Sequence, residues 1–299
     1  MRSSSSGSTG RRSEQYSPLA IAQWMIDNGS DIHQGGDAPL MRAALVDHRI
    51  PMMELLVRNG ANVNAEWDGH FPILFAPCET LNPLALKWLL DNGADPHLLE
   101  RRGHESPLDY VIGTYSRSPL QAQCMRLLMD AGCTSKRNVP AAIELLRGRL
   151  DILEAMLDAD PTLVHRRFSE LDFGSTAYRR MTLHGATLLH VAAEYGNVKA
   201  AQMLLARGAD VNAPAALDAD HVGGQTPLFH AVSQFRDYGL EVARFLLASG
   251  ASLAIRAKLP GHYEQPEDFV ECTPMSYAAM FPGGETRTMA FLRGVGAPE

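Results

Sequence analysis

The sequence predicts an all-α solenoid, in which short helix–turn–helix units stack along one axis. An ending of the form Leu-Leu-x-x-Gly-small-polar recurs along the chain, as at Leu89–Asp95 and Leu204–Asp210. A Thr/Ser-Pro-apolar opening precedes many of these endings, as at Thr226–Val232. The closing glycines Gly29, Gly60 and Gly93 lie 31 and 33 residues apart. A period of this size indicates stacked repeats, not a single globular core.

The most regular unit is Gly185 to Ala213, reading GATLLHVAAEYGNVKAAQMLLARGADVNA. An apolar run follows Thr187, a Gly196-Asn197 turn separates it from a second apolar run, and Gly208 follows that run. We interpret the unit as two short helices, each with one apolar face. The unit is too thin to bury these faces alone, so it needs copies of itself on both sides.

Each part of the motif has a physical reason. Thr or Ser before Pro supplies an N-cap followed by the N1 position, where the missing N–H costs nothing. Paired alanines in the first helix allow neighbouring helices to approach closely. The Leu-Leu pair supplies apolar area between layers, about 1.5–3 kcal/mol for each fully buried side chain. The glycine after the second helix supplies a left-handed C′ residue.

These motifs resemble the ankyrin-repeat family, with its Thr-Pro-Leu-His-x-Ala opening and period of about 33 residues. The resemblance runs from Ser17 to the C-terminus, and the alanine-rich composition and Asp158–Pro161 ending are similar to bacterial members. It implies an ankyrin-repeat solenoid with finger loops, comprising about seven full repeats plus an N-terminal half-repeat. We therefore expect a disordered tail at 1–15 and one ankyrin-repeat domain at 16–299.

Taken in order, the half-repeat is Ser17–His33, and Trp24 is expected to pack on the second repeat. Full repeats follow at 36–64, 68–97 and 103–134, then the least regular repeat at 139–165 and the most regular one at 185–213. The last two repeats are 224–254, which has extra residues between its helices, and 271–299, whose ending departs from the motif. The repeat at 139–165 has Asp160-Pro161 in place of Gly-small. Long finger insertions are predicted at 166–184, 214–223 and 256–270.

Composition narrows the class of protein. The net charge of −7 and pI of about 5.9 argue against a nucleic-acid surface. No run of about 18 apolar residues predicts a membrane span. The four cysteines form no CxxC pair, as expected for free thiols in a reducing cytoplasm.

No enzyme motif is found: GxSxG, a P-loop and GxGxxG after a strand are all absent. His184, His190, His221 and His230 could lie in adjacent repeats, but they lack metal-ligand spacing. The resemblance assigns His190 a structural role. We therefore expect no catalytic residues, no cofactor and no metal.

Two surfaces are candidates for binding a protein partner. The long fingers carry tyrosine and arginine, and insertions into repeats often mark the binding face. In the ankyrin family, the first-helix position before the small residue faces the concave groove. Aromatic residues and arginine are common anchors of binding hot spots. The candidate residues are Arg42, Phe75, Tyr110, Tyr178, Arg179, Arg180, Tyr195, His230, Phe235, Tyr263 and Tyr277. The alternative is that the groove aromatics pack against their own fingers.

The sequence thus favours a monomeric, non-catalytic module that binds a protein through the groove and the C-terminal fingers. One alternative is a small-molecule or enzymatic pocket under the fingers, lined by Arg179, Arg180, His184, His221 and Tyr263. Another is an inhibitor, immunity or effector protein. The identity of the partner is not encoded in any motif.

Overall fold

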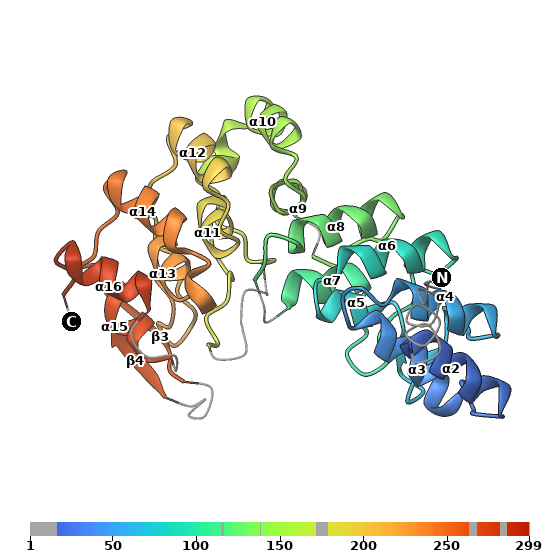
Figure 1. Cartoon of the computed structure of the whole chain (residues 1–299). Coiled ribbons are helices and arrows are strands. Elements are labelled where there is room, and N and C mark those ends of the chain that lie inside the picture. Colours follow the sequence, from blue (N-terminus) through green and yellow to red (C-terminus); the bar gives the residue numbers. More distant parts are fainter. Residues whose placement is uncertain are drawn as a thin grey trace, which may run out of the picture. The chain divides into compact units, whose positions relative to one another are not determined.

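The computed structural model describes residues 17–114, 117–137, 139–171, 179–262, 268–281 and 286–298. The tail expected at 1–15 lies outside the described residues. The chain forms two compact units (Figure 1). The first holds residues up to 111 and 127–134, and the second holds 112–126 and the residues from 135 onward.

The first unit is built from paired helices and one small hairpin. Its elements are α2 (Pro18–Asp27), α3 (Gln34–Ala44), α4 (Ile50–Arg58), β1 (Glu66–Trp67), β2 (Phe71–Pro72), α5 (Phe75–Glu79) and α6 (Pro83–Asp91). Within it, α3 packs on α4 and α5 packs on α6, while α2 packs on α4. Two boundaries between the units fall within α7 (Pro107–Gly113) and α8 (Gln121–Asp130), and the third follows Thr134.

The second unit continues the same helix pairs and adds a two-stranded sheet. Its elements are α9 (Pro140–Arg147), α10 (Leu150–Ala159), η1 (Pro161–Val164), α11 (Leu188–Glu194), α12 (Val198–Ala206), α13 (Pro227–Val232), η2 (Phe235–Asp237), α14 (Leu240–Ala248), β3 (Ala257–Pro260), β4 (Phe269–Cys272), α15 (Pro274–Ala279) and α16 (Arg287–Gly294). First helices stack in chain order, with α11 against α9 and α13, and α13 against α15. The predicted helical solenoid architecture is confirmed.

The local signals act as the sequence predicts. Thr187 and His190 form a capping box at the start of α11, and Thr273 and Ser276 form one at the start of α15. Gly208 ends α12 with a φ of 88°, in the left-handed region.

The repeat at 139–165 keeps both helices but changes its buried face. In α10 the fully buried side chains are Leu153 and Leu157, whereas Met156, which aligns with the buried leucine of regular repeats, is half-buried. Asp160 replaces the closing glycine, and its Oδ1 accepts from the Thr162 N–H at 3.0 Å, which starts η1. The irregular ending is therefore an ordered turn that the Asp160 side chain stabilises.

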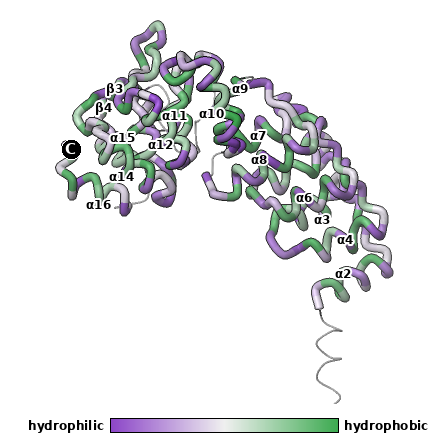
Figure 2. The backbone as a smooth tube through the Cα atoms, turned by 90° about the horizontal axis from the view of Figure 1, so that it is seen from above, coloured by the Kyte–Doolittle hydropathy of each residue, from purple (hydrophilic) through white to green (hydrophobic). Residues whose placement is uncertain are grey.

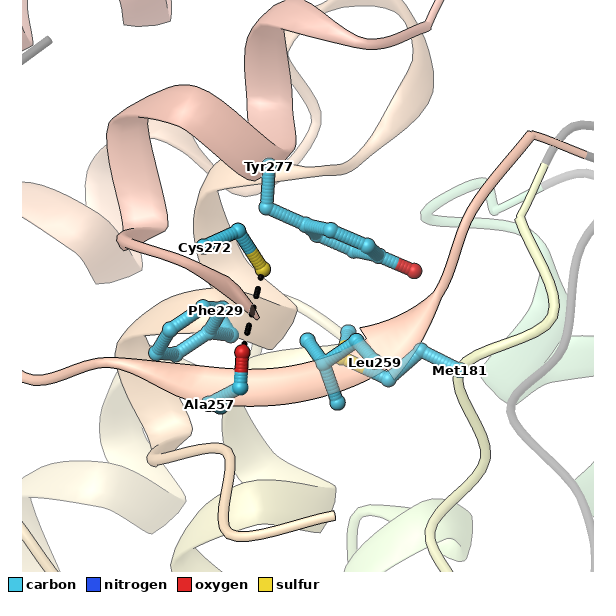
Figure 3. Packing of buried hydrophobic residues seen from close by; sticks show 6 residues of the cluster. All are labelled: Met181, Phe229, Ala257, Leu259, Cys272 and Tyr277. Atoms are coloured by element: carbon cyan, nitrogen blue, oxygen red, sulfur yellow. Dashed lines mark hydrogen bonds between the residues drawn. The ribbon is translucent and has the colours of Figure 1, made fainter. Parts of the chain in front are cut away.

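The first and third fingers, residues 166–184 and 256–270, are tied to the helices by one apolar cluster. Met181 and Leu259 from these fingers pack with Tyr277 of α15 and Phe229 of α13, as Figure 3 shows. The Cys272 thiol donates to the Ala257 carbonyl oxygen at 3.4 Å across the β3–β4 pair. The described parts of these two fingers therefore contribute side chains to the core.

All four cysteines are buried thiols. Burial raises the pKa of the Cys124 and Cys272 thiols to about 12, so these side chains behave as small apolar groups. Among the described residues, no helix combines the length and apolar character needed to span a membrane.

Candidate binding site on the fingers

Backbone hydrogen bonds join the three fingers edge to edge. The Ala216 N–H of the second finger (214–223) donates to the carbonyl of Gly185, directly after the first finger, at 2.9 Å. The Gly223 N–H donates to the Lys258 carbonyl of the third finger at 2.8 Å. The fingers therefore form one continuous surface.

A pocket of about 280 Å³ opens on this surface, and we call it the finger pocket. All three fingers contribute to its walls. The lining residues are Arg180, Met181, Thr182, His184, Ala216, Asp218, Val222, Gly223, Gln225, Leu259, Pro260 and Phe269. Of the residues expected to line a pocket under the fingers, Arg180 and His184 do so.

The finger pocket combines apolar walls with one buried acceptor. Gln225 is 4% exposed, and its Nε2 donates to the Thr182 carbonyl at 3.1 Å. Its Oε1 has no hydrogen-bond partner within the part of the chain that the structure describes. A buried acceptor without a donor is costly, so a ligand N–H or ammonium group that reached it would be favoured.

Two exposed apolar side chains lie on the same surface. Phe269 on the pocket wall is 48% exposed, and Leu217 of the second finger is 57% exposed. The Lys258 ammonium group lies 5.7 Å from the Phe269 ring centroid, in a cation–π arrangement.

Beneath the fingers, a buried group of charged side chains surrounds Glu194 of α11. We call Arg117, Arg179, Glu194 and His230 the Glu194 cluster. Arg179 Nη2 donates to both carboxylate oxygens, at 2.5 and 2.6 Å. Arg117 Nη2 donates to Oε1 at 3.0 Å, and the His230 Nδ1–H donates to Oε2 at 2.8 Å. Because Arg179 belongs to the first finger, the cluster anchors that finger to α11.

Burial and charge set the ionisation of the cluster. Burial alone would raise the pKa of the Glu194 carboxyl, but Arg179, Arg117 and His230 outweigh it and hold that pKa well below its ordinary value. Burial lowers the pKa of His230 despite the opposing effect of Glu194. Two arginines and one carboxylate therefore stand together with a neutral histidine, out of water.

The neighbouring His190 has the structural role that the resemblance implies. Its Nδ1 accepts from the Thr187 N–H at 3.1 Å, so the neutral ring carries its proton on Nε2 and donates to the Gln225 carbonyl at 2.9 Å. Burial, assisted by His230, lowers the pKa of His190 to about 3.

The predicted groove residues are mostly buried. Phe75, His230 and Tyr277 are fully covered, Tyr195 is nearly so, and Tyr110 is half-buried. The Phe75 ring centroid lies 5.4 Å from that of Phe71, on strand β2 of its own finger, and 5.3 Å from that of Tyr110. For Phe75, the alternative of packing against its own finger is the one observed.

The remaining candidates are divided between surface and interior. Arg42 and Arg180 are exposed, and Phe235 is 54% exposed. Arg179 is buried in the Glu194 cluster. Tyr178 and Tyr263 lie outside the described residues.

Sequence reasoning missed the part played by Arg117, which stands in the extra residues between two helices. Its guanidinium also lies 4.6 Å from the Tyr195 ring centroid and donates to the Thr114 carbonyl. The one signal in the sequence was Glu194, which directly follows the apolar run of α11. A carboxylate at such a position needs a positively charged partner if it is buried.

A second pocket of about 300 Å³ lies at the start of α12, bordered by Tyr195, Asn197, Lys199 and Tyr238. It contains none of the predicted finger residues and no buried side chain lacking a partner. Among the described residues, no group of three or more His, Cys, Asp or Glu side chains could hold a metal ion.

Comparison with known proteins gives matches to two family models. The model described as "Ankyrin repeats (3 copies)" matches residues 141–257, and "Ankyrin repeat" matches residues 35–68. The "B-cell lymphoma 3 protein homolog" of Mus musculus is 31% identical over 129 residues. That match covers 43% of this chain, which spans only 26% of the mouse protein. The solved ankyrin repeat domain of human ASB11 is 22% identical, with a TM-score of 0.39 over 87% of this chain and 99% of that one.

Proposed function

Since the chain belongs to the ankyrin-repeat family, we propose that it is a non-catalytic protein-binding module that engages a protein partner through its finger surface. Ankyrin repeats generally act as protein–protein interaction modules, and the finer assignment to the fingers is ours. The observation that carries it is the finger pocket, to which all three long insertions contribute.

The distribution of exposure supports the fingers over the groove. Side chains at the groove position, such as Phe75 and Tyr277, are covered by neighbouring side chains. Leu217 and Phe269 instead present apolar surface beside the finger pocket. A bound partner would remove this area from water, at about 25 cal/mol per Å².

The chemistry of the pocket suggests what the partner offers. Leu259, Pro260 and Phe269 suit an apolar side chain, and the Gln225 Oε1 suits a hydrogen-bond donor next to it. An extended segment with an apolar residue beside a free backbone N–H or a lysine meets both requirements.

The Glu194 cluster supports binding indirectly. Because Arg179 is fixed by two hydrogen bonds to Glu194, the adjacent Arg180 and Met181 are held at the pocket before any partner arrives. A surface ordered in advance loses less conformational entropy on binding.

The experiment compares capture of partner proteins by the intact chain and by the Leu217→Ser/Phe269→Ala variant. Replacing the whole first finger is a poor test, because it would also remove Arg179 from the core. Leu84→Ser is the matched control, since Leu84 of α6 is an apolar side chain that is 63% exposed and belongs to the first unit.

A partner held by the intact chain and the control, but lost by the finger variant, supports the proposal. A partner held equally by all three forms contradicts it and directs attention to Arg42 and Phe235. A small molecule that copurifies with the intact chain and leaves with the finger variant would favour the ligand-binding alternative.

A further inference from the structure

The first described helix, α2, presents an uncovered apolar face. Its ten residues include none that is buried. Ile21 is 46% exposed, Trp24 is 65% exposed and Met25 is 47% exposed. With spacings of three and four residues, these side chains form one stripe, which we call the α2 face. Trp24 was expected to pack on the second repeat, but most of its surface is exposed.

Comparison between repeats shows that this exposure is abnormal for these positions. Met25 lies four residues before the closing glycine of its repeat, at Gly29. The residue at that position in six other repeats is Leu56, Leu89, Leu128, Leu204, Leu246 or Leu292, with exposures of 5, 0, 0, 0, 0 and 0%. Ile21 lies four residues earlier, and the residues at its position in the same six repeats are Met52, Ala85, Cys124, Ala200, Val242 and Thr288. Met52 is half-buried, and none of the other five exceeds 2% exposure.

The other repeats also show what covers these positions. In the regular helix pairs the second helix packs on its own first helix, as α4 does on α3, α12 on α11, α14 on α13 and α16 on α15. Those first helices carry buried small residues, for example Ala192 and Ala193 of α11. α2 is a second helix that packs on α4, at the edge of its unit (Figure 2). Its uncovered face is therefore where a first helix would lie.

The preceding residues have the wrong composition for that helix. Among residues 1–16, the large apolar side chains are Met1 and Tyr16, and serine, glycine and arginine predominate. A first helix needs apolar residues at three- and four-residue spacing, together with small residues.

We propose that the α2 face is a docking site for an amphipathic helix of a partner protein, with alanine or other small residues facing Ile21 and Met25. The docked helix completes the half-repeat, in the helix-in-groove mode of recognition. This site is separate from the finger pocket and does not depend on it.

The test supplies such a helix from the chain's own most regular repeat. A copy of residues 185–196 is inserted directly before Ser17 in the full chain. Ser17 caps α2 as Asn197 caps α12, so the junction reproduces a native one. Tethering is needed because an isolated helix of this length is marginal in water. Trp67→Phe and Trp88→Phe leave Trp24 as the single tryptophan.

The expected result is a blue shift of the Trp24 emission and a higher unfolding temperature than that of the uninserted chain. Changing the two inserted copies of Ala192 and Ala193 to glutamate should abolish both effects. Ile21→Asp/Met25→Asp should do the same without unfolding the chain, since both side chains are already exposed.

Three results would overturn the proposal. The first is an inserted helix that leaves Trp24 emission and the unfolding temperature unchanged. The second is a dimer of the unaltered chain in sedimentation that Ile21→Asp/Met25→Asp abolishes, because a second copy would then cover the α2 face. The third is a red shift of Trp24 on removal of residues 2–16, because those residues would then be the cover.

Discussion

At the scale of single residues, the Glu194 cluster decides how the first finger is held. Glu194 and Arg179 are almost completely buried, so each would be very costly without the other. A pair of this kind adds little stability beyond an apolar alternative, but loss of one member leaves an uncompensated charge. The cluster is therefore sensitive to single changes.

Glu194→Gln should lower the free energy of unfolding by about 3–5 kcal/mol, because two buried guanidinium groups lose their only carboxylate within the cluster. Urea unfolding monitored by circular dichroism measures this change. Glu154→Gln is the control, since Glu154 pairs with Arg207 at 2.9 Å on the surface, where such pairs contribute little. Equal losses in the two variants would contradict the assigned role of Glu194.

Stability should also fall as the pH is lowered from about 6.5. The pKa of His190 drops from an ordinary 6.5 to about 3 in the folded chain, so the unfolded chain binds a proton that the folded chain does not. Each such proton lowers the free energy of unfolding by up to about 1.4 kcal/mol per pH unit. The depressed pKa of Glu194 adds a further loss once the pH falls below 4.5.

Urea titrations at pH 7, 6 and 5 test this dependence. His190→Asn should make the stability less dependent on pH over that range, although it lowers the stability at pH 7. A free energy of unfolding that is constant from pH 7 to pH 5 in the unaltered chain would contradict the buried neutral state of His190.

Residue roles were predictable from sequence only where they are local. The cap formed by Thr187 and His190 joins residues three positions apart, and its motif identifies it. Arg117 and Glu194 lie 77 residues apart, and Arg179 and Glu194 lie 15 apart across a finger. No period or spacing rule links these side chains, so their pairing appears only in three dimensions.

At the scale of elements, the second finger depends on a close backbone approach at Gly223. Gly223 has a φ of 121°, and an added Cβ would lie 2.4 Å from the Ala216 carbonyl oxygen. Gly208 also has a positive φ, of 88°, but an added Cβ there would meet nothing within 4 Å. A side chain at Gly223 would therefore cause both a steric clash and backbone strain, whereas one at Gly208 would cause backbone strain alone.

Gly223→Ala should open the finger pairing and lower stability by about 1–3 kcal/mol more than Gly208→Ala does. Gly208→Ala should lose only the roughly 1–2 kcal/mol of left-handed strain. Amide exchange of Gly223, whose N–H donates to Lys258, should become faster in the first variant only. Unchanged exchange of this amide in Gly223→Ala would show that the fingers are not joined there.

Most helices could be predicted because most repeats carry their own caps, small residues and closing glycine. The buried face of α10 could not be predicted, because its buried residues are Leu153 and Leu157, and Leu157 lies one position later than the buried leucine of regular repeats. The covered groove aromatics escaped prediction for a similar reason. Whether Phe75 faces solvent depends on Phe71 and Tyr110, which come from other elements.

At the scale of the whole molecule, the repeats made the architecture predictable. The features that distinguish this chain are the places where it departs from the repeat pattern. The repeats supply a stack of helix pairs that many ankyrin-repeat proteins share. The three fingers and the uncovered α2 are the departures from that pattern. The second finger, the third finger and α2 each expose large apolar side chains, such as Leu217, Phe269 and Trp24. Neither the partner nor the use of these surfaces could follow from the repeats themselves.

The most direct test of the proposed function is hydrogen–deuterium exchange of the chain, free and in complex with a captured partner. We predict slower exchange in residues 216–225, 257–262 and 269–272, with α4 and α6 unchanged. The Leu217→Ser/Phe269→Ala variant, mixed with the same partner, should show no slowing in these segments. Slower exchange confined to other helices, with the finger amides unchanged, would contradict the finger surface as the binding site.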